Sequence, residues 1–170
     1  MINKAVLALI FFLPLDLYAN SATLLIKAKV IKNAITAIPI QKLDFGIIKT
    51  NNNYTVINVS PFGNRSGNNN NIDYSSSSYA GITKIKGDPN TNYKINIPSS
   101  VIFNNVENTG SLVVDKFMVW SKNLNKTITK NGILDDKGFD ILNIGGSLNI
   151  APNSKAGNYK GFVNISISYN

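Results

Sequence analysis

Apolar residues recur at every second position along most of this chain, as in Thr55-Val-Ile57-Asn-Val59, and short runs of Asn, Gly, Ser and Pro separate the alternating segments. Alternation with a period of two is the pattern of a half-buried β-strand, and turn residues at this spacing are typical of an all-β sandwich or barrel. We therefore predict an immunoglobulin-like β-sandwich of about eight to ten short antiparallel strands, with almost no helix.

The last segment of the chain has the clearest alternation. Its apolar side chains fall on one face of a strand, and they are Val163, Ile165, Ile167 and Tyr169. Two glycines, Gly157 and Gly161, precede them. We predict that residues 159–169 form one continuous strand. The closing strand of an ordinary β-sandwich has this pattern too.

Residues 1–19 have the pattern of a secretory signal peptide. Lys4 is followed by an uninterrupted apolar run over residues 5–13, then by Pro14 and the small residue Ala19. This order predicts cleavage between Ala19 and Asn20. A retained membrane anchor is the alternative, but the run is shorter than the ~20 residues that a spanning helix needs. We expect an exported mature chain without an integral membrane segment.

Residues 20–32 are predicted to form an extension ahead of the sandwich domain, which covers residues 33–170. Every second residue within the extension is apolar, and these residues are Leu24, Ile26, Ala28 and Val30. An extended segment with this alternation can be added as a strand to the exposed sheet edge of another chain. Two interpretations stay open: a donor strand for a neighbouring copy, or the first strand of the chain's own domain.

Two internal segments also carry predictions. Residues 63–78 are rich in Asn and Ser and have little to bury, which predicts a solvated surface loop that is a candidate for ligand or receptor contact. Residues 80–85 and 93–97 alternate on either side of a turn at residues 87–90, and we predict that they pair as a hairpin.

The composition argues against several classes of function. The formal net charge is +8, but the lysines are scattered and Arg65 is the single arginine. Nucleic-acid binding requires clustered Lys and Arg with exposed aromatics, so we expect no nucleic-acid partner. The chain has no His and no Cys, and therefore lacks the commonest general base, a thiol nucleophile and any disulfide. We predict that the protein is not an enzyme and needs no cofactor.

The acidic residues form one local cluster, which consists of Asp135, Asp136 and Asp140. A calcium loop requires oxygen ligands at closely alternating positions that end in a bidentate acid, and this segment lacks that arrangement. We predict a turn here and no metal site.

The chain as a whole resembles domain-of-unknown-function family 4402, a family of secreted bacterial proteins. The matching pieces are Leu43-Asp-Phe45-Gly46, Gly145-Gly146-Ser-Leu148 and residues 55–65, 82–87, 93–98 and 157–162. The C-terminal segment is also similar to that of subunits assembled by the chaperone–usher fimbrial pathway, with a penultimate Tyr169 and with Gly157 thirteen residues before the last one. This resemblance implies a pilin-like sandwich with a C-terminal assembly strand formed by Gly157, Gly161, Val163, Ile165, Ile167 and Tyr169.

The same resemblance implies a set of partners. In such subunits a donor segment carries a small residue among bulkier ones, and Ala28 takes that position here. The leading hypothesis is a structural subunit of a bacterial fimbria or pilus, held by a periplasmic chaperone, passed to an outer-membrane usher and polymerised at the cell surface as a homo-oligomer. The alternative is a monomeric secreted or cell-surface sandwich that binds a ligand through its loops.

Overall fold

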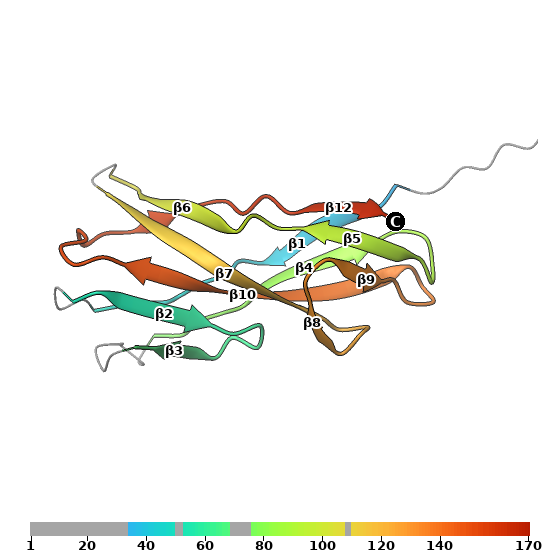
Figure 1. The fold of residues 1–170 in the computed structure, drawn as a ribbon, viewed down its shortest axis with the longest axis horizontal. Helices are drawn as coiled ribbons and strands as arrows, with labels where there is room; N and C mark the ends of the chain where they lie inside the picture. Colours follow the sequence, from blue (N-terminus) through green and yellow to red (C-terminus); the bar gives the residue numbers. More distant parts are fainter. Residues whose placement is uncertain (1–33, 50–52, 69–75, 108–109) are drawn as a thin grey trace, which may run out of the picture. The chain divides into compact units, whose positions relative to one another are not determined.

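Twelve strands and no helix form from the residues that the structure, a computed structural model, describes, namely 34–49, 53–68, 76–107 and 110–170 (Figure 1). In chain order the strands are β1 (Thr36–Gln41), β2 (Thr55–Val59), β3 (Arg65–Gly67), β4 (Gly81–Lys86), β5 (Asn92–Asn96), β6 (Ser100–Asn105), β7 (Ser111–Ser121), β8 (Lys126–Ile128), β9 (Asn131–Ile133), β10 (Phe139–Ile150), β11 (Tyr159–Lys160) and β12 (Ser166–Tyr169). The predicted all-β fold with antiparallel pairing is confirmed. The predicted signal peptide, residues 1–19, and extension, residues 20–32, lie outside the described residues.

Nine of the described strands form a large sheet with the order β1-β4-β10-β7-β6-β11, to which β2, β3 and β8 are added at the side. β10 is central because residues 139–144 pair with β4, residues 146–150 pair with β2, and β7 runs along its other side. Gly145 lies at the changeover from β4 to β2, and a side chain there would collide with the backbone of Val59 and Ser60. This close approach requires glycine.

The small sheet has the order β12-β5-β9. Buried residues of β5 pack together with buried residues of β4, β7 and β10, so the two sheets face one another across a core. This inter-sheet cluster consists of Ile85, Tyr93, Ile95, Val119, Ile128, Leu134, Leu142 and Ile144. A second cluster consists of Phe45, Ile57, Val59, Leu112, Val114, Leu148 and Ile150.

The predicted hairpin of residues 80–85 and 93–97 is wrong. β4 ends at Lys86 in the large sheet and β5 begins at Asn92 in the small sheet, so the chain crosses between the sheets. In this crossover the N–H of Gly87 donates to the carbonyl of Gly138 at 2.9 Å, and the N–H of Asn90 donates to the carbonyl of Asp135 at 2.9 Å. These bonds to the turn at residues 135–138 replace the cross-strand bonds that a hairpin would have made.

The predicted continuous strand over residues 159–169 is also wrong. β11 pairs with β6 in the large sheet, whereas β12 pairs with β5 in the small sheet. Residues 161–165 carry the chain from one sheet to the other without joining a ladder. Burial still alternates through this passage, with odd-numbered residues half-buried and even-numbered residues exposed. The alternation therefore indicates which face is covered but not which strand is the partner.

A buried carboxylate joins the two sheets. Asp140 on β10 is 1 % exposed, and its Oδ2 accepts hydrogen bonds from the hydroxyl of Tyr93 on β5 at 2.7 Å and from the hydroxyl of Ser121 on β7 at 2.6 Å. Its Oδ1 accepts a third bond from the backbone N–H of Asn123 at 3.2 Å. Burial, followed by the hydrogen bond to Asp140 and the negative charge of that residue, raises the pKa of Tyr93 well above its ordinary value.

This pKa shift predicts a loss of stability at alkaline pH. The native Tyr93 stays protonated where the unfolded tyrosine, with a pKa of about 10, ionises. Its contribution is therefore complete below about pH 10 and is lost as the pH rises further, by about 1.4 kcal/mol per pH unit. We expect Tyr93→Phe to show a shallower fall in the free energy of unfolding above pH 10 than the wild-type protein, measured by urea unfolding. Tyr79→Phe, at an exposed position, is the matched control, and equal alkaline slopes in all three proteins would contradict the prediction.

Candidate assembly interface

The small sheet has a free edge at β12. This strand pairs with β5 in a register that runs from Ser166 opposite Asn96 to Tyr169 opposite Tyr93, and no other described strand pairs with its opposite side. An edge of this kind leaves backbone N–H and C=O groups without ladder partners. The outer side of β12 is therefore a place where a further strand can be added.

Apolar side chains follow the inner face of this edge. Ile165, Ile167 and Tyr169 pack against the inter-sheet cluster, yet each of them is only half-buried. Ile35 and Ile97, which are also half-buried, contact the same cluster. The core of the sandwich is thus incompletely covered along β12.

Among the described strands, β1 is one edge of the large sheet, and it lies beside β12 (Figure 1). Some Cα atoms of the two strands approach within 8 Å, but the strands do not pair. All six residues of β1 are exposed, and they include Ala37 and Pro39, which lie opposite the buried Ile85 and Thr83 of β4. Residues on the face of a sheet that points towards the core are exposed where no neighbouring described element covers them. Within the part of the chain that the structure describes, the sandwich is therefore open between β1 and β12.

Tyr169 fixes the end of β12 to the crossover between the sheets. Its hydroxyl oxygen accepts a hydrogen bond from the backbone N–H of Asp88 at 2.7 Å. A Cβ on Gly87 would lie 2.5 Å from this hydroxyl and 2.9 Å from a methyl group of Leu134, so only glycine leaves room for the tyrosine. The penultimate tyrosine thus holds the free edge in a defined position.

The six residues of the predicted assembly strand occupy two separate places. A side chain on Gly157 would meet Asn105, and one on Gly161 would meet Phe103, so both glycines lie against β6 of the large sheet. Val163 lies half-buried in the passage between the sheets, and only Ile165, Ile167 and Tyr169 reach the open edge. The predicted donor residues Leu24, Ile26, Ala28 and Val30 lie outside the described residues.

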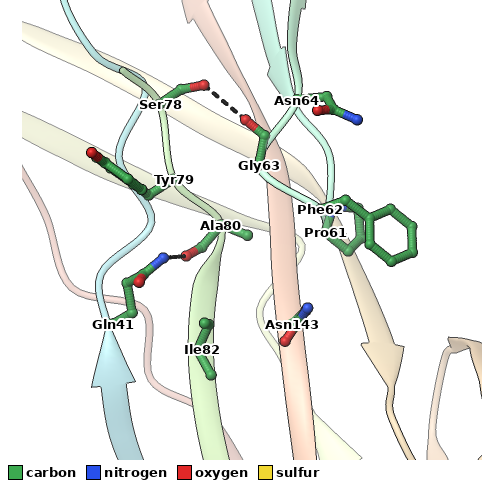
Figure 2. Close-up of a pocket in the computed structure, with 10 residues that line it drawn as sticks. All are labelled: Gln41, Pro61, Phe62, Gly63, Asn64, Ser78, Tyr79, Ala80, Ile82 and Asn143. Carbon is green, nitrogen blue, oxygen red and sulfur yellow. Dashed lines mark hydrogen bonds between the residues drawn. The ribbon is translucent and has the colours of Figure 1, made fainter. Parts of the chain in front are cut away.

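A second candidate site is a pocket on the large sheet, with a volume of about 320 Å³. Its lining residues are Gln41, Pro61, Phe62, Gly63, Asn64, Ser78, Tyr79, Ala80, Ile82 and Asn143. Figure 2 shows Gln41 and Tyr79 on one side of the segment that carries Ala80 and Ile82, with Phe62 and Asn143 on the other side. The pocket was not foreseen from the sequence, because its residues come from four separate segments. The one local signal was Phe62, an aromatic residue in a turn between Pro61 and Gly63.

The segment over residues 63–78 was predicted as a loop throughout, but residues 65–67 form β3 and pair with β2; its two ends border the pocket. Ser78 Oγ donates to the carbonyl of Gly63 at 2.8 Å and so closes the base of the loop. Arg65 supplies a second tie: its Nη1 donates to the carbonyl of Phe45 at 2.8 Å, and its Nη2 donates to the carbonyl of Ser76 at 2.9 Å. The ends of the loop are thus held to the sheet. Residues 69–75 lie outside the described residues.

The acidic cluster has a structural explanation. Asp135 Oδ1 accepts hydrogen bonds from the N–H groups of Lys137 at 3.0 Å and Phe139 at 2.7 Å, which is the geometry of a turn, and Asp140 is buried between the sheets. Within the described part of the chain, no three His, Cys, Asp or Glu residues lie close enough to hold a metal ion. Over the same residues there is no helix of the length and hydropathy needed to span a membrane.

Comparison with known proteins gives one match. Residues 35–169 match the family described as Domain of unknown function (DUF4402). Neither the curated proteins nor the solved structures contain a match. The family match covers most of the chain, from β1 to β12, and it confirms the resemblance to domain-of-unknown-function family 4402. The protein therefore belongs to the DUF4402 family.

Proposed function

We propose that this protein is a structural subunit of a bacterial surface fibre, in which an extended segment of one copy completes the sandwich of the next copy. The observation that carries the proposal is the free edge of β12, with Ile165, Ile167 and Tyr169 half-buried beneath it. An added strand would pair with the backbone of β12 and cover these side chains at the same time. Backbone pairing supplies affinity and the apolar side chains supply register.

The extension at residues 20–32 is the proposed donor. Leu24, Ile26, Ala28 and Val30 alternate as a strand with one apolar face, which suits a half-covered core. These four side chains of one face are spread over seven residues, which also matches the length of a short strand.

The direction of the neighbouring strands favours a donor from another copy. β1 begins at the end of the sandwich where β12 finishes, because Thr36 pairs with Lys86 while the hydroxyl of Tyr169 lies against Gly87. A segment that preceded β1 and lay over its own domain would therefore run parallel to β12. A segment from another copy can run antiparallel, and antiparallel pairing is slightly more stable per residue.

An open apolar edge also accounts for the proposed partners. Unpaired edges with exposed apolar residues promote aggregation, so a subunit of this kind requires a partner that covers β12 before assembly. A periplasmic chaperone would supply that cover, and an outer-membrane usher would exchange it for the donor segment. Both partners require export of the chain, in keeping with the signal-peptide pattern of residues 1–19.

The test is the Ile26→Asp variant. A charge in the apolar space beside β12 is costly to desolvate, so the donor segment should no longer insert. We expect the wild-type protein to form detergent-resistant multimers on gels, and the Ile26→Asp variant to lack them while its exported monomer keeps the thermal midpoint of the wild-type monomer. Thr23→Asp adds the same charge on the opposite face of the alternation and should still form multimers.

The opposite pattern would overturn the proposal. If residues 22–30 are the first strand of their own domain, Ile26→Asp lowers the thermal midpoint of the monomer. A wild-type protein that never forms multimers, together with this lower midpoint, would support the alternative of a monomeric secreted sandwich.

A further inference from the structure

The pocket belongs to the outward face of the large sheet. Strand pairing places Gln41, Ile82, Asn143, Trp120 and Thr127 in one row across β1, β4, β10, β7 and β8. The neighbours of Asn143 along β10, Leu142 and Ile144, are buried in the inter-sheet cluster, so Asn143 faces outward. The outward face therefore has an amide between an isoleucine and a tryptophan.

Aromatic side chains border this row. Phe62 is 63 % exposed and Tyr79 is 49 % exposed. Such exposure is unusual for aromatic side chains, because each can bury a large apolar area against a partner. Phe62 meets Trp120 edge to face, with ring centroids 5.4 Å apart and an angle of 64° between the ring planes. Aromatic surface is thus available at the pocket and extends from it to Trp120.

Polar groups at the pocket are free to bind a ligand. The side chains of Asn64, Tyr79 and Asn143 make no hydrogen bond to any described residue. Gln41 uses its Nε2 to donate to the carbonyl of Ala80 at 2.9 Å, which leaves its Oε1 available as an acceptor. The amides of Gln41, Asn64 and Asn143 and the phenol of Tyr79 provide both donors and acceptors around the pocket.

The lining excludes charged ligands as the natural occupant. None of the ten residues around the pocket carries a charge. A nucleotide would require cations for its phosphates, and none lines this pocket. The volume of about 320 Å³ lies at the lower end of the ~300–1,000 Å³ of small-molecule sites, which suits a ligand of one or two rings.

We propose that this pocket binds a neutral saccharide. A sugar ring presents C–H groups that pack on an aromatic side chain and hydroxyl groups that both donate and accept hydrogen bonds. Phe62 offers the first kind of contact, and Asn143, on the same side of the segment that carries Ala80 and Ile82, offers the second (Figure 2). The pocket is in the large sheet and the open edge of β12 is in the small sheet, so saccharide binding does not depend on the fibre hypothesis.

The chain carries a reporter for this test, because Trp120 is its single tryptophan and contacts Phe62. The probes are the methyl glycosides of glucose, galactose, mannose and N-acetylglucosamine, together with lactose and maltose. We expect at least one probe to cause a saturable change in the fluorescence of Trp120, with a dissociation constant of about 1 mM or lower. Ligand-observed NMR then measures the affinity of variants without reliance on Trp120.

Three variants decide the outcome. Phe62→Ala and Asn143→Ala should weaken binding of that probe about tenfold or more, since each removes a central contact. Phe162→Ala, at a phenylalanine that is 88 % exposed and does not line the pocket, should bind as the wild-type protein does. The proposal is overturned if none of the six probes binds, or if Phe62→Ala binds as tightly as Phe162→Ala.

Discussion

Replacement of Asp140 by alanine is expected to leave little folded protein. The substitution removes the only acceptor shown for the hydroxyl hydrogens of Tyr93 and Ser121, and it also removes the acceptor of the Asn123 N–H. Tyr93 and Ser121 are fully buried, so water cannot take the place of the carboxylate. Each of these two buried donors left unpaired costs about 1–3 kcal/mol, so their sum approaches the lower end of the ~5–15 kcal/mol by which a domain is stable.

The measurement is the soluble yield together with the free energy of unfolding in urea. Tyr93→Phe is the graded control, because it removes one donor and leaves the other two bonds to Asp140 in place; we expect a loss of about 1–2 kcal/mol. An Asp140→Ala protein that accumulates normally and unfolds within about 1 kcal/mol of the wild type would show that the carboxylate does not hold the two sheets together.

Some strand positions could be predicted from the strict alternation of side chains. Residues 55–59 are predicted and observed as a strand with the same bounds, and their burial alternates between buried and half-buried. The physical reason is local: a strand that covers a core needs apolar residues at every second position, whatever its partner. The all-β class follows from the same pattern, repeated along the chain.

Strand partners could not be predicted in this way. β4 and β5 alternate as a hairpin would, but the bonds of Gly87 and Asn90 to the turn at residues 135–138 send β5 into the other sheet. Likewise the C-terminal alternation continues across the passage from β11 to β12. Alternation specifies a buried face, whereas the partner depends on contacts between residues far apart in the sequence.

The candidate sites, too, could be predicted from the sequence only in part. The C-terminal apolar positions were found from the sequence, but only Ile165, Ile167 and Tyr169 reach the open edge, since the neighbouring glycines serve contacts with β6. The sequence places Asp140 in an acidic turn, because it follows Asp135 and Asp136 closely. Its burial depends on Tyr93, forty-seven residues away, which no local pattern reveals.

Deletion of residues 161–170 is expected to abolish accumulation of the folded protein. It removes β12 and with it the contacts of Ile165, Ile167 and Tyr169 with the inter-sheet cluster. Full burial of such side chains contributes about 1.5–3 kcal/mol each, and half-burial about half of that, so the three together contribute several kcal/mol. The deletion also turns β5 from a central strand into an edge strand and exposes the buried Tyr93 and Ile95.

Tyr169→Phe separates the packing of this strand from its hydroxyl contact. The ring remains against the cluster while the hydrogen bond with the N–H of Asp88 is lost, so we expect a loss of about 1 kcal/mol and near-normal accumulation. Protein levels in cell extracts and thermal unfolding of the purified proteins measure both effects. A truncated protein with the yield and thermal midpoint of the wild type would mean that β12 adds no stability to the sandwich. In that case Tyr169 and β5 would not hold β12 in a fixed position in the intact protein. The free edge on which the fibre hypothesis rests would then be undefined.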